Sequence, residues 1–219
     1  MKKELDSKIY KYLELVYSKN QVMNITGFKN KEDILNEGII NSLLAFEPLI
    51  NQIDLNSVYS LLDIGAGPGF PSVPVLIENQ NLFKLTIMES QKKRCEFLKN
   101  VSEDLNLNFQ IINSRAEEYN HNYVFDFITA RALSSIKNIF LMSHHLLKKN
   151  GYWYLLKGEN YQVEIDEFLH FFPEKSKDIE IFKYLTFDNK LSYIVKIKKT
   201  KNTPKNWPLK WNNILNYKK

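Results

Sequence analysis

One stretch decides how the rest of the chain is interpreted: Leu61-Leu62-Asp63-Ile64-Gly65-Ala66-Gly67-Pro68-Gly69-Phe70-Pro71. Three of the seven glycines stand here at alternate positions, directly after an apolar run that predicts a buried strand. Glycine adopts positive φ and lets a ligand approach the backbone, and a turn from strand to helix points free N–H groups outward. The stretch therefore predicts a strand, a tight turn and a helix start that hold a nucleotide-like ligand.

The spacing of these glycines distinguishes two kinds of ligand. A dinucleotide-binding loop has the pattern G-x-G-x-x-G, but here Gly69 comes one residue early and Phe70 takes the position of the third glycine. The strand ends in an acid, Asp63, which suits an ammonium or sulfonium group better than a diphosphate. The pattern resembles motif I of the Rossmann-like S-adenosylmethionine-dependent methyltransferases. We expect Asp63, Gly65, Gly67 and Gly69 to bind this cofactor; the alternative is a turn without a ligand.

The composition is that of a soluble globular protein, with 44% apolar and 25% charged residues. The 219 residues fit one structural domain, divided into an N-terminal helical cap (1–55), a Rossmann-like core (56–199) and a basic tail (200–219). The single cysteine, Cys95, excludes an internal disulfide, and no apolar run reaches the ~18 residues of a membrane span. Since the first residues lack the apolar core of a signal peptide, we expect a cytoplasmic protein that meets no membrane.

Hydrophobic periodicity predicts strands and helices that alternate after the glycine loop. The expected elements are strand 82–88, helix 91–105, strands 109–113 and 125–129, helix 136–147, strand 152–156, helix 163–172, and a closing hairpin of 179–187 and 191–197. Asn150-Gly151 is expected to stop the helix that precedes it. Before the loop, an amphipathic first helix and a second helix capped by Asn30 are expected. The alternation implies right-handed βαβ units and a mostly parallel α/β sheet with helices on both faces.

Polar residues follow the predicted strands, at the edge where ligands of such sheets bind. Glu89 follows the second strand at about the offset from the glycine loop at which an acid accepts ribose hydroxyls. The alternative is an acid stabilised by the dipole of the helix that follows. Ala116 and Glu117 follow the third strand, where a backbone N–H and a carboxylate would meet the edge of an adenine. The alternative there is the cap of a short helix.

Lysine is concentrated at the C-terminal end. Residues 196–219 hold eight lysines and no acid, so the rest of the chain is net acidic although the whole carries +5. The tail also holds Trp207 and Trp211, and aromatic rings among cations suit stacked bases and phosphates. The alternative is a solvated tail whose tryptophans pack on the core. The residues expected to bind RNA are Lys199, Lys201, Lys205, Trp207 and Lys210.

Several motifs occur in an order typical of one family. They are Met23-Asn24-Ile25-Thr26, the glycine loop with its Gly-Phe-Pro end, Arg115-Ala116-Glu117-Glu118, Thr129-Ala130-Arg131-Ala132, Leu156-Lys157-Gly158 and the tail Lys-Thr-x-x-Thr-Pro-x-x-Trp-Pro. Over nearly the whole chain they resemble the bacterial small-subunit (16S) ribosomal RNA guanine-N7 methyltransferases, also called glucose-inhibited division protein B. The resemblance implies a seven-stranded class I methyltransferase fold. It also implies cofactor contacts at Gly65, Phe70, Ala116, Glu117 and Arg131.

The chain departs from this family at two RNA-facing places. Where the family often has His-x-x-Asp-Ser, this chain has Gly38-Ile39-Ile40-Asn41-Ser42. Leu209-Lys210 replaces the arginine usual in the tail.

The expected chemistry needs few side chains. Guanine N7 has an exposed lone pair, so no general base is required, and alignment of the reactants is the main demand. We expect the residues of the site to position the reactants and none to take part in the chemistry. Arg131 and Lys157 are expected to support this positioning. Arg131 is expected against the methionine carboxylate or an RNA phosphate, and Phe70 is expected to offer its ring face to the sulfonium. No metal site is expected, because the His144-His145 pair has no acid or cysteine at ligand spacing.

The sequence thus predicts methyl transfer from S-adenosylmethionine to N7 of a guanine in a loop of 16S ribosomal RNA. The substrate would be naked RNA or the 30S subunit, and the enzyme a monomer. Two alternatives stay open: an RNA-binding module that performs no reaction, and a methyltransferase that acts on a small molecule.

Overall fold

Seven strands form one sheet in the order β3-β2-β1-β4-β5-β7-β6. In the computed structural model, which describes residues 5–218, the strands from β3 to β5 run parallel and β7 is antiparallel to both β5 and β6. The strands are β1 (Tyr59–Ile64), β2 (Phe83–Met88), β3 (Gln110–Ile112), β4 (Phe125–Arg131), β5 (Leu147–Lys157), β6 (Ile179–Leu185) and β7 (Leu191–Lys198). The expected mostly parallel, seven-stranded sheet is confirmed, including its closing hairpin.

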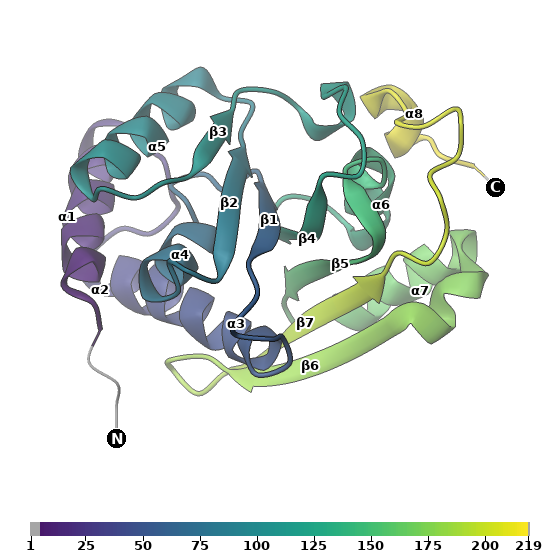
Figure 1. Ribbon diagram of the computed structural model, residues 1–219. Coiled ribbons are helices and arrows are strands. Elements are labelled where there is room, and N and C mark those ends of the chain that lie inside the picture. Colours follow the sequence, from purple (N-terminus) through teal and green to yellow (C-terminus); the bar gives the residue numbers. More distant parts are fainter. Residues whose placement is uncertain (1–4, 219) are drawn as a thin grey trace.

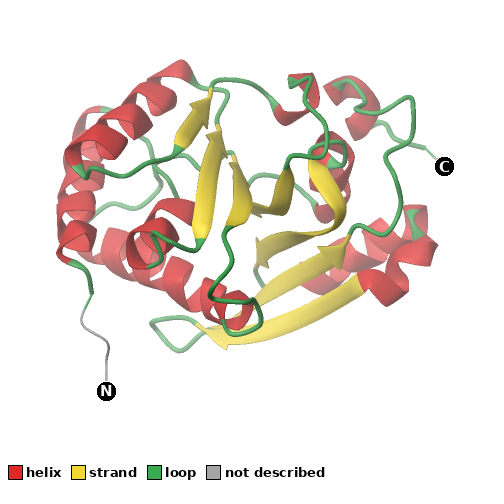
Figure 2. Cartoon of the chain, in the orientation of Figure 1, coloured by secondary structure: helices red, strands yellow, loops and turns green. Residues whose placement is uncertain are grey.

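Helices cover both faces of this sheet (Figures 1 and 2). The first face carries α1 (Ser7–Val22), α2 (Lys31–Asp33), the π-helix η1 (Ile34–Ile40), α3 (Asn41–Ile50), α4 (Ser72–Glu78) and α5 (Lys92–Asp104). The second face carries α6 (Ile136–Ser143), α7 (Tyr161–Phe171) and α8 (Trp211–Leu215). Two short 3-10 helices, η2 (Ala116–Glu118) and η3 (Pro173–Asp178), lie in the connections. Each face buries its own apolar cluster against the helices that cover it.

The N-terminal helices share the core of the first face. As expected, Asn30 caps the second helical segment, since its side chain accepts the N–H of Asp33 at 2.8 Å. From there α2, η1 and α3 follow one another without a break. The Tyr154 hydroxyl of β5 donates to the carbonyl of Ala45 at 2.7 Å, and the Phe46 ring meets the Tyr154 ring edge-on. Residues 5–50 therefore pack on the sheet rather than around a core of their own.

The end of α6 differs from the expectation. The helix ends at Ser143, and Asn150-Gly151, interpreted above as its stop signal, lies inside β5. Asn150 has φ of +68°, and a Cβ at Gly151 would lie 2.7 Å from the carbonyl oxygen of Asp126 on β4. The glycine is needed because two strands approach closely where their pairing register shifts.

The tail leaves β7 and returns along the second face to α8 (Figure 1). Lys199, at its root, is fully buried, and its ammonium donates to the carbonyls of His144 and Leu147, both at 2.7 Å. The expected RNA contact of Lys199 therefore does not fit the structure, because three acceptors, Thr203 included, draw this group inward. Trp207 likewise packs on rings of the second face, Phe140 among them. Within residues 5–218 no helix has both the length and the apolar character to cross a membrane.

Candidate active site

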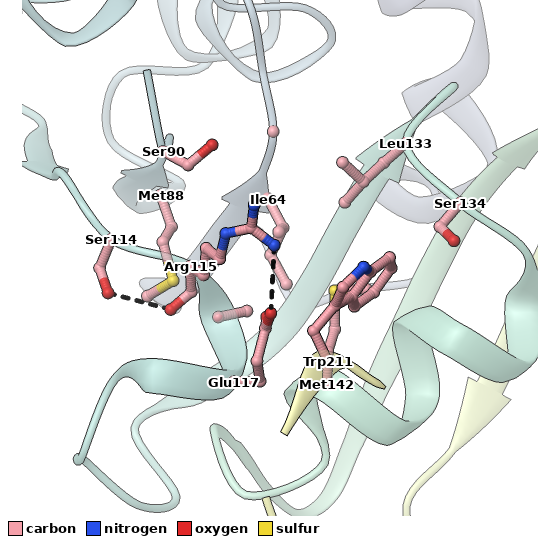
Figure 3. Close-up of a pocket in the computed structure, with 12 residues that line it drawn as sticks. Ile64, Met88, Ser90, Ser114, Arg115, Glu117, Leu133, Ser134, Met142 and Trp211 are labelled. Atoms are coloured by element: carbon pink, nitrogen blue, oxygen red, sulfur yellow. Dashed lines mark hydrogen bonds and ion pairs between the residues drawn. The ribbon is translucent and has the colours of Figure 1, made fainter. Parts of the chain in front are cut away.

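A cavity of about 210 Å³ opens at the carboxyl ends of the parallel strands (Figure 3). Ile64 and Gly65 line it from the end of β1, Met88 from β2, and Ala116 and Glu117 from the connection after β3. This is the edge at which the sequence analysis places the cofactor, and three of the residues expected to bind it reach the cavity. The others lie beneath or beside it.

The glycine loop adopts the backbone shape that its sequence predicts. Gly65, Gly67 and Gly69 have φ of +71°, +58° and +115°. At Gly69 a Cβ would lie 2.6 Å from Cγ2 of Val73, so only glycine fits there. The loop is also fastened from the N-terminal helices, since the buried Tyr12 hydroxyl of α1 donates to the carbonyl of Pro68 at 2.9 Å. Helix α1 thereby fixes the loop in place.

Asp63 lies fully buried beneath this loop. Its Oδ2 accepts the Ser72 N–H at 3.3 Å, and within the described residues its Oδ1 has no hydrogen-bond partner. Burial, with a smaller contribution from the charge of Glu89, raises the pKa of Asp63 to about 7. Asp63 does not line the cavity, so its orphaned oxygen lies in the protein interior beneath the glycine loop.

The Asp63 carboxyl predicts a specific pH dependence of stability. Because its folded pKa is above the unfolded value of 3.8, the folded state binds the extra proton between these values and loses stability as the pH rises towards 7. We expect Asp63→Asn to gain about 2.5 kcal/mol relative to wild type between pH 5 and pH 8. Urea unfolding of both proteins at several pH values measures this difference. A difference that does not change with pH would show that Asp63 ionises normally.

Glu89 directly follows β2 and lies beneath the loop, with 3% of its surface exposed. Its Oε1 accepts the Gln91 N–H at 2.9 Å and its Oε2 accepts the Gly67 N–H at 3.3 Å. The Arg94 guanidinium lies 3.7 Å from Oε2. A carboxylate has about four acceptor positions, so further donors can still bind. Glu89 thus joins β2, the glycine loop and the start of α5.

Glu117 presents a second orphaned oxygen. Its side chain is 5% exposed, and the buried Oε1 makes no hydrogen bond among the described residues. The Arg115 guanidinium lies 3.8 Å away, too far for a hydrogen bond (Figure 3). A buried acceptor without a donor is costly unless a ligand supplies one. Glu117, which lines the cavity, therefore fits a ligand that brings an N–H donor to it.

Phe70 and Arg131 lie on the other side of the loop, away from the cavity. A Cβ at Gly38 would lie 2.6 Å from the Phe70 ring, so π-helix and ring are in direct contact. The Arg131 guanidinium lies 6.0 Å from the centre of the same ring and donates to the carbonyls of Glu37 at 2.7 Å and Gly38 at 3.3 Å. Both side chains therefore join β4 and the loop to η1. The expected anionic partner of Arg131 is replaced here by backbone carbonyls.

Lys157 holds the connection between β4 and α6. Its ammonium donates to the carbonyl of Ser134 at 2.9 Å and to Glu164 at 2.7 Å. Glu164 also accepts the N–H of Ile136 at 2.9 Å. This connection carries Leu133 and Ser134 to the cavity wall. Lys157 thus fixes the connection that carries part of the cavity wall, and its expected supporting role stays a prediction.

Several further residues of the cavity wall are not predicted from the sequence: Met88 of β2, Ser90, Ser114, Leu133, Ser134, Met142 of α6 and Trp211 of α8. Leu133 directly follows Arg131-Ala132 at the end of β4, and its position after a strand was the available signal. Nothing near Met142 or Trp211 in the sequence points to the cavity, because they reach it through the packing of the second face.

The two neighbouring histidines are buried parts of this packing. His144 Nδ1 hydrogen-bonds to the Thr203 hydroxyl at 2.8 Å, and burial lowers the pKa of His144 to about 3. His145 Nε2 lies 2.9 Å from the carbonyl oxygen of Tyr119. Within residues 5–218 no group of three or more histidine, cysteine and acidic side chains is placed to hold a metal ion.

Comparison with known proteins agrees with this geometry. The family described as GidB, rRNA small subunit methyltransferase G, matches residues 5–182. The chain belongs to this family. A ribosomal RNA small subunit methyltransferase G of Mycoplasmopsis pulmonis is 38% identical over 213 residues, which cover 95% of this chain and 91% of the relative. The protein of the same name from Macrococcus caseolyticus is 32% identical and covers 91% and 84%.

Solved structures show the same fold at low sequence identity. Human methyltransferase 10 domain containing protein matches with a TM-score of 0.59 and 13% identity, over 87% of this chain and 97% of that chain. The tRNA methyltransferase TrmI from Aquifex aeolicus matches with a TM-score of 0.58 and 13% identity, over 87% and 76%. The rRNA small subunit methyltransferase G family and the class I S-adenosylmethionine-dependent methyltransferase fold, both expected from the sequence, are thereby confirmed.

Proposed function

We propose that this protein transfers a methyl group from S-adenosylmethionine to N7 of a guanine in a loop of small-subunit ribosomal RNA. The observation that carries the proposal is a cavity at the carboxyl end of the sheet, in a chain of the rRNA small subunit methyltransferase G family. Within residues 5–218, two buried carboxylate oxygens make no hydrogen bond: Oδ1 of Asp63 lies beneath the glycine loop, and Oε1 of Glu117 lies at the cavity wall. Glu117 supplies an acceptor for the amino group of a nucleoside.

The residues of the chain bind and orient rather than exchange protons. When bound, the cofactor supplies an electrophilic methyl group on a sulfonium. The backbone from Gly65 to Gly69 holds the methionine end, Glu89 accepts ribose hydroxyls, and Ala116 and Glu117 meet the adenine edge. Guanine N7 presents its lone pair without prior deprotonation, so no side chain serves as general base. The rate enhancement comes from the alignment of N7 with the methyl carbon and the sulfur. The carbonyls of η1 hold Arg131. Its positive charge therefore stays away from the guanine ring, which becomes cationic when N7 is methylated.

Two other methyl acceptors fit this site less well. Enzymes that methylate exocyclic amines carry Asn/Asp-Pro-Pro-Tyr/Phe after the fourth strand, whereas β4 ends here in Thr129-Ala130-Arg131-Ala132. Methylation of cytosine C5 requires a cysteine nucleophile. Cys95 is buried in α5, its thiol donates to the carbonyl of Glu89 at 3.2 Å, and burial raises its pKa. Both features favour, as the methyl acceptor, a ring nitrogen of the base that needs no activation.

The target guanine must be unpaired or turned outward for its edge to enter the site. The tail lysines that remain exposed, Lys201, Lys205 and Lys210, would contact the phosphates around it. Lys201 also lies 3.5 Å from the exposed Glu174, so part of its charge is already balanced. A cytoplasmic monomer that binds naked RNA or the small subunit agrees with these features.

Removal of the tail charges should weaken RNA binding in a salt-dependent way. We expect the triple variant Lys201→Gln, Lys205→Gln, Lys210→Gln to lower affinity for a ribosomal RNA fragment about tenfold and the slope of log K against log salt by about 2. The matched control replaces three exposed lysines outside the tail and η3, which are Lys11 of α1, Lys84 of β2 and Lys99 of α5. Filter binding at several salt concentrations measures both quantities. Equal loss in both triple variants would indicate that net charge alone binds the RNA.

The function itself is tested by incubating the protein with methyl-labelled S-adenosylmethionine and either naked small-subunit RNA or 30S subunits. The proposal expects label in the RNA and strand cleavage at one guanine after treatment specific for N7 methylation. RNA binding without label would support the non-reactive module. Label transferred only to small molecules of an extract would support the second alternative.

A further inference from the structure

The two tail tryptophans have different surroundings. The Trp207 ring packs against four rings of the second face, those of Phe140, His144, Phe172 and Tyr217. Trp211, the first residue of α8, lines the cavity instead, beside Met142 and across from Glu117 (Figure 3). No other aromatic ring of residues 5–218 packs against the Trp211 indole, and its N–H makes no hydrogen bond there. Both indoles pack against the apolar cluster of the second face, and of the two only Trp211 also lines the cavity.

The chain on both sides holds Trp211 in this place. Towards the N-terminus, Trp207 is packed as described and the buried Lys199 ammonium anchors the root of the tail. Towards the C-terminus, Ile214 is fully buried in the apolar cluster of the second face. An aromatic side chain fixed in advance loses little entropy when a ligand stacks on it. Its half-buried state therefore reflects an open side of the cavity rather than a loose tail.

The walls of the cavity define the ligand that would fill this side. Ile64, Met88 and Met142 present apolar surface, and Trp211 adds an aromatic one. At the edge, the buried Oε1 of Glu117 has no hydrogen-bond partner within the described chain and requires an N–H donor. A flat, apolar heterocycle with an amino group at its edge meets both demands. Adenine has this chemistry, and the connection after the third strand is where the cofactor's adenine is proposed to lie.

We propose that Trp211 forms the outer wall of the adenine site and stacks on the base whose amino group donates to Glu117. This inference rests on the proposed use of S-adenosylmethionine. It makes the C-terminal tail part of the cofactor site as well as the proposed RNA surface. Trp211 is a binding residue in this assignment and takes no part in the chemistry.

Tryptophan fluorescence tests the assignment without turnover. The chain has three tryptophans, so titration with S-adenosylhomocysteine reports on Trp153, Trp207 and Trp211 together. We expect Trp211→Phe to remove most of the ligand-induced change while affinity stays within about threefold, because phenylalanine can still stack. Trp207→Phe, the matched control, should keep the change. By calorimetry, Trp211→Ala should bind about tenfold more weakly, as expected for a lost base–aromatic stack.

A second probe assigns the loss to the adenine end. 5′-Methylthioadenosine lacks the amino-acid part of the cofactor, and Trp211→Ala should weaken its binding by the same factor. Trp211→Phe restores the aromatic ring and should recover affinity for both probes, which separates stacking from a folding defect. A full fluorescence change in Trp211→Phe with wild-type affinity in Trp211→Ala would overturn the role of Trp211 alone. Failure of the wild-type protein to bind S-adenosylhomocysteine would instead overturn the proposed function.

Discussion

Replacement of Glu89 by alanine is expected to lower the affinity for S-adenosylhomocysteine about 1000-fold, because hydrogen bonds to a charged group contribute ~1.5–3 kcal/mol each. The variant loses the proposed ribose acceptor. It also frees the N–H groups of Gly67 and Gln91, which Glu89 holds from beneath the loop. Both losses act on the same ligand, since the loop and the acid lie on one edge of the sheet. Calorimetric titration of the purified variant measures the effect.

Two controls separate ligand binding from helix stabilisation. Glu89→Gln keeps one acceptor oxygen and should fall between wild type and alanine. Glu96→Ala removes an exposed acid of α5, the helix that begins just after Glu89, and should leave affinity unchanged. If Glu89 serves only as a favourable charge near the start of α5, Glu89→Ala will unfold at a lower temperature and still bind the ligand as wild type does.

The sequence predicts those parts of the site at which the backbone conformation determines the residue type. Alternate glycines after an apolar run predict a sharp turn at the end of a strand, and Gly65 and Gly69 have the positive φ that such a turn requires. The positions of Glu89 and Glu117 follow in turn, because polar residues directly after parallel strands meet at one edge. These inferences use only short stretches of chain and the rules of sheet topology.

Predictions fail where contacts between distant elements decide the outcome. Asn150-Gly151 carries the local signal of a helix end, but the approach of Gly151 to Asp126 on the neighbouring strand places it in β5. The charge of Lys199 predicts a solvent-exposed side chain, yet carbonyls at the end of α6 supply better partners. Trp211 reaches the cavity only because the tail folds back over the second face. None of these contacts leaves a periodic pattern in the sequence.

The surroundings of Arg131 show the same limit and lead to a distinct expectation. From the sequence, its guanidinium is expected against an anionic ligand, since the chain mostly uses lysine and has arginine only at positions 94, 115 and 131. In the structure the group bonds two carbonyls of η1 and approaches the Ser42 hydroxyl at 3.4 Å, and it lies over the rings of Phe28 and Phe70. A π-helix displaces carbonyls from the regular pattern, so a fixed planar donor is well suited to satisfy them.

We therefore expect Arg131→Ala to lower the free energy of unfolding by about 4 kcal/mol, because it removes the bonds of the guanidinium to the carbonyls of Glu37 and Gly38 and to the Ser42 hydroxyl. Arg131→Lys should recover part of this, since an ammonium can reach only some of the acceptors. The exposed Lys183 of β6 provides the control, and Lys183→Ala should stay within about 0.5 kcal/mol of wild type. Urea unfolding gives these values. Should Arg131→Ala unfold like wild type and yet lose cofactor or RNA affinity, the guanidinium would belong to the ligand, as the sequence alone predicts.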